Sequence, residues 1–409
     1  MKKFMKQMQE KGLLVKGAAV IAFAFVFGVV IFAFIAQKSI PVGAGLQLPA
    51  SEKKGLQKAS TPAPSVMAVP DKAEETDGAK QQVKGASAKE LEEDETVHLG
   101  FAGDICLDDT CAVMRHMKEK GGFSKVISKK LVQKMRGYDC MVINNEFSVS
   151  KRGAPMEGKA YTFRSHPSNL KYLKYLGVDV VGLANNHIYD YGEDAFLDTL
   201  KYLKNAGFQT VGAGKNKKEA KEPVYLTMKN KKIAIVAATR AEKYILTPEA
   251  GKNSPGVFRT YQDKAYVKEI KKAAKKADYV IAYVHWGTEY STELEDAQKT
   301  QARDYINAGA DVVVGAHTHC LQGMEWYKGV PIFYSLGNFW FNERTLYTTV
   351  LEIDITKEGR LSAKMLPCLQ KGKETRLLSK KKQKQKFANY VNSISVNGRL
   401  DEEGNVHKK

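Results

Sequence analysis

The sequence predicts an α/β fold. Short apolar runs rich in valine and isoleucine alternate along the chain with longer segments whose apolar residues recur at helical spacing. Several of the helical segments end at a glycine, which is typical of a helix C-terminus. From this alternation alone we expect a single doubly wound sheet with helices on both faces.

The apolar runs that we predict to be buried strands are residues 97–103, 138–144, 178–184, 231–238, 277–284, 310–316 and 330–337. Amphipathic helices are predicted at residues 123–137, 168–177, 193–207, 263–277 and 293–309. The chain has 409 residues, 43% of them hydrophobic, and can therefore bury a substantial core. This length excludes a small scaffold that depends on disulfides.

The N-terminal residues carry the pattern of a membrane anchor. Residues 1–16 are a basic segment, and residues 17–36 are an apolar run with no charged side chain. At about 1.5 Å per residue, this run crosses a hydrocarbon core of about 30 Å. We expect a cytoplasmic basic segment, an uncleaved transmembrane signal-anchor at 17–36 and an extracytoplasmic remainder of the chain, which makes a single-pass protein of the cell membrane. A cleaved signal peptide is the alternative, although its apolar part is usually only about 7–15 residues long.

The rest of the chain divides by composition. Residues 37–95 are rich in Ser, Pro, Ala, Lys and Glu, and we predict a disordered tether because such a segment buries too little apolar surface to fold. The main domain is expected at 96–370, followed by a basic C-terminal helix and tail at 371–409. The chain has five cysteines, so at least one thiol is unpaired within the chain, and a disulfide between Cys106 and Cys111 is left open.

The net charge of +19 indicates a partner of opposite charge. Part of the excess lies in the lysine-rich N-terminus and in the run from Lys380 to Lys386. No recognised nucleic-acid-binding motif accompanies the charge, so we predict contact with an anionic surface polymer or with lipid headgroups, and no contact with nucleic acid.

Polar side chains with metal-binding chemistry follow the predicted strands. Because the carboxyl ends of strands in an open α/β sheet line the ligand crevice, residues far apart in the sequence are expected to converge there. Two carboxylates, an amide oxygen and several imidazoles form a mixed set of oxygen and nitrogen donors that suits Zn²⁺, Mn²⁺ or Fe. The candidate ligands are Asp104, Glu146, Asn186, His285, His317 and His319.

Each of these residues also has a purely structural interpretation. An aspartate after a strand often caps a helix, as Asp104 would, and Asn185 and Asn186 are common turn residues. His285 alone would be interpreted as a hydrogen-bonded core imidazole. We favour metal binding because the candidates occur together at several strand ends, and because His317 and His319 project to the same side of an extended segment.

Seven motifs in order carry a resemblance to a known family: "GDICL", "INNEF", "YTFRSHP", "GLANNHIYDYG", "YVHWGTEY", "VVGAHTHCLQG" and "IFYSLGNF". From about His98 to Leu369 the chain resembles the CapA (PgsA) family of poly-γ-glutamate capsule synthesis proteins, within the calcineurin-like metallophosphoesterase superfamily. The resemblance implies a four-layer α/β/β/α sandwich, with two facing mixed sheets, in place of the single sheet expected from the alternation.

The resemblance also implies roles for individual residues around two divalent metal ions. Asp104 and His319 would bind the first ion, and Glu146 would bridge the two. The second ion would be completed by Asn186, His285 and His317. The role implied for His187 is that of an unligated general acid or hydrogen-bond donor at the leaving group, with Asp190 orienting its imidazole.

One position departs from the superfamily pattern. Where that pattern has Asp-x-His, this chain has Asp104-Ile105-Cys106. Three explanations stay open: Cys106 supplies a thiolate ligand, the first site is under-coordinated, or another residue such as Glu289 substitutes. Arg164 is a candidate for binding an anionic substrate through its planar guanidinium, and a surface salt bridge is the alternative.

Two classes of function remain. The first is a metal-dependent hydrolase of a phosphoester or related bond, acting in the biosynthesis of poly-γ-glutamate capsule or another envelope polymer. The second is a non-catalytic subunit that binds the anionic polymer and assists membrane synthase subunits in making or exporting it. The His187 donor favours catalysis, whereas the missing superfamily histidine and the basic charge favour binding.

Overall fold

The computed structural model describes residues 95–242 and 246–409. The chain divides into two units, Met1–Ser87 and Ala88–Lys409, and all described residues belong to the second. The predicted basic segment, the signal-anchor at 17–36 and all but the last residue of the predicted tether therefore lie outside the described residues. Within the described part, no helix has both the length and the apolar character that crossing a membrane requires.

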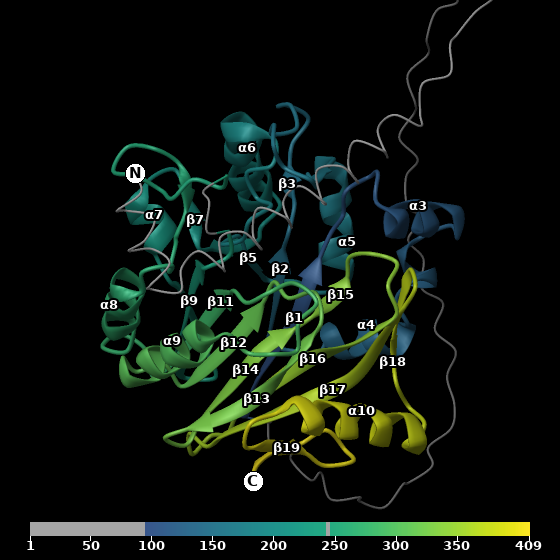
Figure 1. Cartoon of the computed structure of the whole chain (residues 1–409), viewed down its shortest axis with the longest axis vertical. Helices are drawn as coiled ribbons and strands as arrows, with labels where there is room; N and C mark the ends of the chain where they lie inside the picture. Colours follow the sequence, from purple (N-terminus) through teal and green to yellow (C-terminus); the bar gives the residue numbers. More distant parts are fainter. Residues whose placement is uncertain (1–94, 243–245) are drawn as a thin grey trace, which may run out of the picture. The chain divides into compact units, whose positions relative to one another are not determined.

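The first sheet contains eight strands within the described residues (Figure 1). Its order is β18-β17-β16-β1-β2-β5-β6, with β15 also beside β1. Strands β1, β2, β5 and β6 are parallel, whereas β16, β17 and β18 are antiparallel to their neighbours, so the sheet is mixed. The strands are β1 (Val97–Ile105), β2 (Cys140–Asn145), β5 (Val180–Gly182), β6 (Gln209–Val211), β15 (Asn338–Trp340), β16 (Leu346–Ile355), β17 (Leu361–Lys371) and β18 (Glu374–Leu377).

The second sheet has six strands in the described part of the chain, in the order β13-β14-β12-β11-β9-β8. It is also mixed, because β9, β11, β12 and β14 are parallel while β8 and β13 pair antiparallel at its edges. The strands are β8 (Val224–Met228), β9 (Lys231–Thr239), β11 (Tyr279–His285), β12 (Val312–Ala316), β13 (Leu321–Tyr327) and β14 (Val330–Leu336).

Each predicted helical segment coincides with a shorter helix, whereas the helices at Ala112–Glu119 and Lys217–Lys221 were not predicted. The predicted helix 123–137 is interrupted, and consists of a 3-10 turn at Phe123–Lys125 and the helix α4. The α-helices are α3 (Ala112–Glu119), α4 (Lys129–Met135), α5 (Leu170–Tyr175), α6 (Gly192–Asn205), α7 (Lys217–Lys221), α8 (Lys264–Ala273), α9 (Asp296–Asn307) and α10 (Lys381–Ile394). The remaining short elements are a 3-10 turn at Pro167–Asn169, β3 (Ser148–Val149), β4 (Arg164–Ser165), β7 (Ala213–Gly214), β10 (Gly256–Val257), β19 (Gly398–Leu400) and β20 (Val406–Lys408).

The hydrophobic core explains how the sheets and helices are layered. Neighbouring residues of a strand point to opposite faces, so Ile143 packs in the cluster that contains the helices α3 to α6, whereas Val142 packs in a cluster shared by both sheets. In the second sheet, Ile281 joins that shared cluster and Val280 packs with residues of α8 and α9. Each sheet is therefore buried on both faces.

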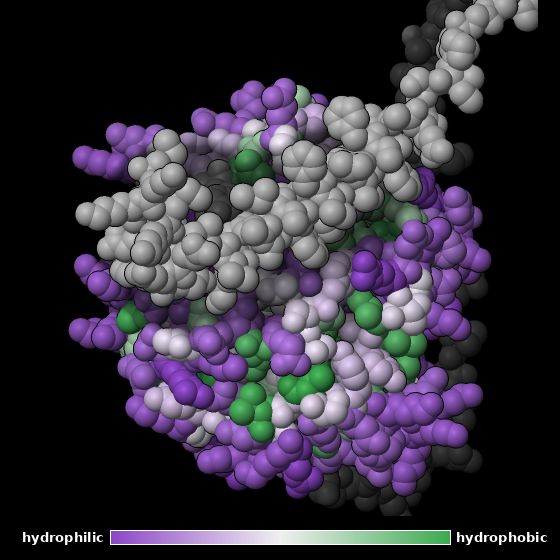
Figure 2. Space-filling view, in the orientation of Figure 1, coloured by the Kyte–Doolittle hydropathy of each residue, from purple (hydrophilic) through white to green (hydrophobic). Residues whose placement is uncertain are grey.

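The α/β class is confirmed, but the single doubly wound sheet expected from the alternation of elements is wrong. A strand that is apolar on both faces carries no signal for which neighbours it pairs with, so the sequence pattern cannot separate one sheet from two. On the face shown in Figure 2, hydrophilic residues predominate and hydrophobic ones form small separate areas, as expected when the apolar surface is buried inside.

The C-terminal segment packs on the same core. Helix α10 lies across β13 and β17 in Figure 1, and its Phe387 and Val391 are buried in the cluster shared by the sheets. The apolar face of α10 is thus covered, while its first turn carries the exposed lysines of the basic run.

The chain crosses from the second sheet to the first through a single glycine. Strand β14 of the second sheet ends at Leu336 and β15 of the first sheet begins at Asn338, so only Gly337 separates them. Gly337 has a φ of 66°, and its carbonyl oxygen accepts a 2.9 Å hydrogen bond from the backbone N–H of Asp104. A Cβ atom on Gly103 would lie 1.8 Å from that carbonyl oxygen, so both glycines are needed for this close approach.

We predict that Gly103→Ala destabilises the fold by about 2 kcal/mol or more, because the added methyl group forces β1 away from the Gly337 turn. Thermal and urea unfolding of the purified protein measure the change. Gly137→Ala is the matched control, since its Cβ would meet backbone oxygens only at 3.4 Å and beyond. Equal stability of the two variants would contradict the proposed constraint.

Candidate metal centre

The candidate ligands gather where the carboxyl ends of strands from both sheets meet. Asp104 lies near the end of β1, Glu146 directly follows β2, and His285 is the last residue of β11. His317 and His319 follow β12. All five side chains are buried, and all come from the strand ends at which the sequence predicted them.

The first group consists of Asp104, Glu146 and His319, whose potential ligand atoms all lie within 4.8 Å of one another. His319 Nδ1 is 3.3 Å from Asp104 Oδ2, and His319 Nε2 is 3.8 Å from Glu146 Oε1. This arrangement offers two carboxylates and one imidazole to a cation.

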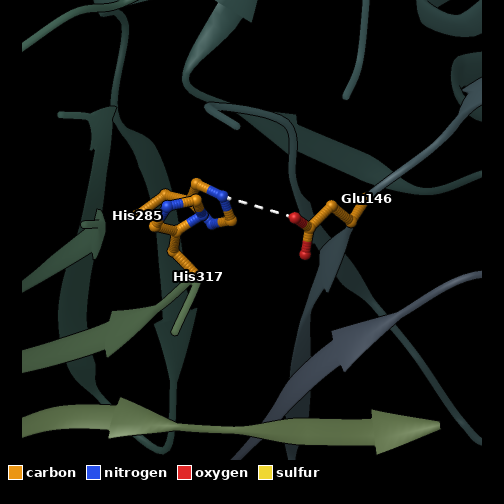
Figure 3. A group of neighbouring side chains, drawn as sticks. All are labelled: Glu146, His285 and His317. Carbon is orange, nitrogen blue, oxygen red and sulfur yellow. Dashed lines mark ion pairs between the residues drawn. The ribbon is translucent and has the colours of Figure 1, made fainter. Parts of the chain in front are cut away.

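The second group consists of Glu146, His285 and His317, again within 4.8 Å (Figure 3). The carboxylate of Glu146 faces the two imidazoles, and its Oε1 is 3.5 Å from His285 Nε2. The rings of His285 and His317 are 4.5 Å apart. Asn186 also reaches this group, since its Oδ1 is 2.8 Å from His285 Nε2. Glu146 is thus common to both groups.

Among the candidate ligands, two buried atoms make no hydrogen bond to any described residue: Glu146 Oε1 and His317 Nδ1. A buried polar atom without a partner is costly, which is a reason to expect that a ligand satisfies it. The donors are a mixture of carboxylate oxygen, amide oxygen and imidazole nitrogen, and this mixture fits Zn²⁺, Mn²⁺ or Fe. The residues present therefore suit divalent metal ions.

The electrostatics of the site support the same interpretation. Burial raises the pKa of Glu146 well above its usual range, and the charges of Asp104 and Glu289 raise it further. Burial lowers the pKa of His285 and of His317, and so keeps both imidazoles neutral, the form that binds metals. Buried carboxylates that repel one another are stabilised when they share a cation.

His319 differs from the other two histidines. Burial alone would lower its pKa, but the hydrogen bond to Asp104 and the charge of that carboxylate raise the pKa overall. Its Nδ1 also lies 2.8 Å from Asn338 Oδ1. The imidazole is therefore fixed in orientation by groups on two different strands.

His187 lies beside these groups but belongs to neither. Its Nδ1 is 2.7 Å from Asp190 Oδ2, and the same carboxylate oxygen accepts a 2.7 Å hydrogen bond from the backbone N–H of Phe163. His187 directly follows Asn186, whose Oδ1 contacts His285, and its backbone N–H donates to Asn185 Oδ1 at 3.1 Å. With Nδ1 bound to Asp190, the Nε2 atom of His187 is available for another partner.

The structure adds Lys159, which the sequence did not indicate. Its Nζ is 2.7 Å from Asp190 Oδ1 and 3.2 Å from Glu242 Oε1, and it also donates to the backbone oxygen of Asn186. Its side chain is only 6% exposed. A lysine in a polar loop is ordinarily exposed to solvent, so the local sequence does not predict that Lys159 is buried against these two carboxylates.

Two asparagines orient the carboxylates. Asn144 Nδ2 donates to Asp104 Oδ1 at 2.8 Å and to Glu146 Oε2 at 3.1 Å, and its own Oδ1 accepts from Asn185 at 3.0 Å. Such outer hydrogen bonds fix the direction of ligand atoms in metal sites. The motif that contains Asn144 was noted in the sequence, but this role was not.

Arg164 lies in a different environment from these residues. Its Nη1 donates to the backbone oxygens of Arg152 and Gly153, each at 3.0 Å, and the guanidinium stacks on the ring of Tyr191 at 4.2 Å. These contacts hold the loop that contains Lys159 in place. The suggestion that Arg164 binds substrate stays a prediction.

The residues considered as replacements for the missing superfamily histidine are not in either group. Among the described residues, the clusters able to hold a metal contain neither Cys106 nor Glu289. The Sγ of Cys106 lies 3.6 Å from the Sγ of Cys111, and both thiols are free. Burial raises the pKa of the Cys106 thiol, with Cys111 adding to the effect, so the thiolate form is disfavoured.

We predict that Lys159→Met destabilises the protein by about 3 kcal/mol, because it leaves the buried Asp190 and the nearby Glu242 without their cation. Urea unfolding measures the change. Lys151→Met, which removes an exposed lysine from the same loop, is the control and should have little effect. Unchanged stability of the Lys159 variant would show that the ammonium is not needed to hold this loop.

Comparisons with known proteins identify the family. Residues 98–343 match the family of the bacterial capsule synthesis protein PGA_cap. The capsule biosynthesis protein CapA of Bacillus anthracis is 31% identical over 300 residues, covering 70% of this chain and 71% of the relative. The PGA biosynthesis protein CapA of Bacillus subtilis is 32% identical over 271 residues, covering 65% of this chain and 70% of the relative.

Among solved structures, the NAD nucleotidase of Haemophilus influenzae matches with a TM-score of 0.42 and 16% identity, covering 75% of this chain and 65% of that one. A hypothetical protein from Thermus thermophilus matches with a TM-score of 0.42 and 14% identity, covering 68% of this chain and 100% of that one. The family resemblance seen in the sequence motifs is confirmed by the sequence match over residues 98–343, and the chain belongs to the PGA_cap family of bacterial capsule synthesis proteins.

Proposed function

We propose that this protein acts in the biosynthesis of poly-γ-glutamate capsule, or of a related envelope polymer, as a metal-dependent hydrolase of a phosphoester or related bond. Its membership of the PGA_cap family supports the process, as do the names of its relatives from Bacillus anthracis and Bacillus subtilis. The reaction is supported by the geometry of the site: two overlapping groups of buried ligands share Glu146, and the His187–Asp190 pair lies beside them.

The proposed centre holds two divalent ions in a metallophosphoesterase-like, four-layer domain. The first would be bound by Asp104, Glu146 and His319, and the second by the bridging Glu146 with Asn186, His285 and His317. Two bound cations would stabilise the negative charge that develops on oxygen during hydrolysis. The shared carboxylate and the two ligand atoms without a hydrogen bond are the observations that support this assignment.

His187 is proposed to donate a proton, or a hydrogen bond, to the departing oxygen. Its Nδ1 is engaged by Asp190, so the opposite ring nitrogen is the one that faces a substrate. The second oxygen of Asp190 is bound by Lys159. The pair is therefore held in one orientation from two sides, which suits a proton donor that must act at a fixed place.

The location proposed is the outer side of the cell membrane. The support comes from the sequence, in which a basic segment precedes the apolar run at 17–36 and a polar tether follows it. The proposed partners are the membrane, an anionic polymer such as poly-γ-glutamate, and membrane synthase subunits. Nucleic acid is not among them.

A second candidate function is a non-catalytic subunit that binds the polyanion. One observation favours it: at the position of the superfamily histidine, the chain has Cys106, and this thiol faces Cys111 instead of joining the first group. The first ion would then have fewer protein ligands than the second. A weakly held first ion would favour binding of the polymer over its hydrolysis.

We predict that His187→Ala lowers turnover about a hundred-fold or more and leaves the metal content unchanged, because it removes a proton donor and no ligand. The assay is a screen of phosphomonoesters and phosphodiesters with Mn²⁺ or Zn²⁺, using the full-length protein in detergent. His166→Ala is the control, since His166 is exposed and bonds only within its own turn and to Asp109. If the wild type hydrolyses none of the substrates but binds poly-γ-glutamate tightly, the hydrolase proposal is rejected.

We also predict that Glu146→Gln lowers the content of both metal ions, because one carboxylate serves both groups. His317→Ala should lower the content of the second ion only. Elemental analysis of the purified proteins after dialysis against a dilute chelator provides the measurement. Equal loss in the two variants would contradict the shared role of Glu146.

A further inference from the structure

We propose that Arg344, stacked on the ring of Tyr290, forms an oxyanion-binding subsite at the edge of the metal centre, and that it takes a carboxylate or phosphate group of the substrate. The residue lies in the loop between β15 and β16. This proposal rests on the proposed function in one respect: it assumes that the substrate binds at the two groups of buried metal ligands.

Aromatic rings connect this loop to the histidines of the site. The ring of Phe341 lies 4.5 Å from that of His319 and 5.3 Å from that of Phe163, which in turn lies 4.6 Å from the ring of His187. The ring of Tyr290 also lies near His319, with a ring separation of 5.7 Å. The start of the β15–β16 loop therefore forms a wall of the metal centre.

Tyr290 is held in an unusual backbone conformation. Its φ is 59°, a left-handed value that is rare for an aromatic residue. Its backbone N–H donates to the oxygen of Thr318 at 2.7 Å, and its hydroxyl accepts a 3.0 Å hydrogen bond from Asn342 Nδ2. Strained residues that are fixed in this way are frequent at ligand sites, and here the strain turns the ring toward both His319 and Arg344.

A buried glutamine fixes the backbone of the loop. Gln370, on β17, is fully buried, and its Nε2 donates to the backbone oxygens of Asn342 at 2.6 Å and of Arg344 at 3.0 Å. The position of Arg344 is therefore set from inside the protein, although its side chain is at the surface. A binding group that is positioned before the ligand arrives loses less entropy on binding.

The guanidinium of Arg344 lies 3.8 Å from the centre of the Tyr290 ring and makes no hydrogen bond or ion pair to any other described residue. Other arginines here are engaged: Arg303 pairs with Glu325, and Arg164 donates to backbone oxygens. The N–H groups of Arg344 are thus available while its flat face is fixed by the ring. This planar fork matches a carboxylate or a phosphate bidentately.

The test uses the full-length chain in detergent, with Mn²⁺ present, and two probes that distinguish the sources of the oxyanion. Binding of a γ-linked glutamate decamer is measured by calorimetry, and KM and kcat are measured with p-nitrophenyl phosphate. We expect Arg344→Ala to raise the Kd or the KM of at least one probe about ten-fold, with kcat and metal content unchanged. An effect on the decamer identifies the group as a carboxylate, and an effect on the KM identifies it as a phosphate.

Two further variants make the test specific. Arg344→Lys keeps the charge but not the planar fork and should recover only part of the affinity. Arg399→Ala removes an exposed arginine on β19 and should leave both probes unaffected, because it controls for net charge. If Arg344→Ala changes neither Kd nor KM, or if Arg399→Ala matches its effect, the subsite is rejected.

The result separates this proposal from the proposed function. Loss of turnover in His187→Ala, together with unchanged KM and Kd in Arg344→Ala, rejects the subsite and retains the hydrolase. Weaker decamer binding in Arg344→Ala, with no turnover in the wild type, supports the subsite and rejects the hydrolase.

Discussion

The buried carboxylate of Glu146 is the constraint on which the rest of the site depends. It lies between imidazoles from the second sheet and a carboxylate from the first, with one oxygen that has no hydrogen-bond donor among the described residues. Leaving such a group unpaired is costly, and the surrounding acids raise its pKa further. A cation that shared this charge would account for the asparagines that orient the carboxylates and for the lowered pKa of His285 and of His317.

Much of this site could be predicted from the sequence, because the relevant rule is geometric. Within each sheet, parallel strands place their carboxyl ends at one edge, which brings Asp104 near Glu146 and His285 near His317 from positions far apart in the chain. The meeting of the two sheets at these ends does not follow from that rule. The pairing of His187 with Asp190 follows from their short separation in a turn. The positions of the strand-end residues can be predicted once the strands are assigned, and the apolar runs in the sequence are sufficient to assign them.

Other features depend on contacts that no local pattern encodes. The division into two sheets is one of them. Neighbouring residues such as Val142 and Ile143 point to opposite faces of their strand and both are apolar, so the pattern does not show which sheet the strand joins. Lys159 is another, because its burial depends on where Asp190 and Glu242 come to lie. The position of Arg344 is likewise set by Gln370, whose amide bonds are visible only in three dimensions.

The turn at Gly337 has a consequence for how stability and ion binding are related. The same short stretch joins the sheets, accepts the hydrogen bond of Asp104 and supplies Asn338 to His319. Separating the two sheets at the Gly337 turn would therefore displace Asp104 and His319, the residues proposed to bind the first ion. By thermodynamic linkage, an ion that binds only when the two sheets are joined would stabilise their junction, so a bound cation would have a structural role in addition to the one proposed for it in the reaction.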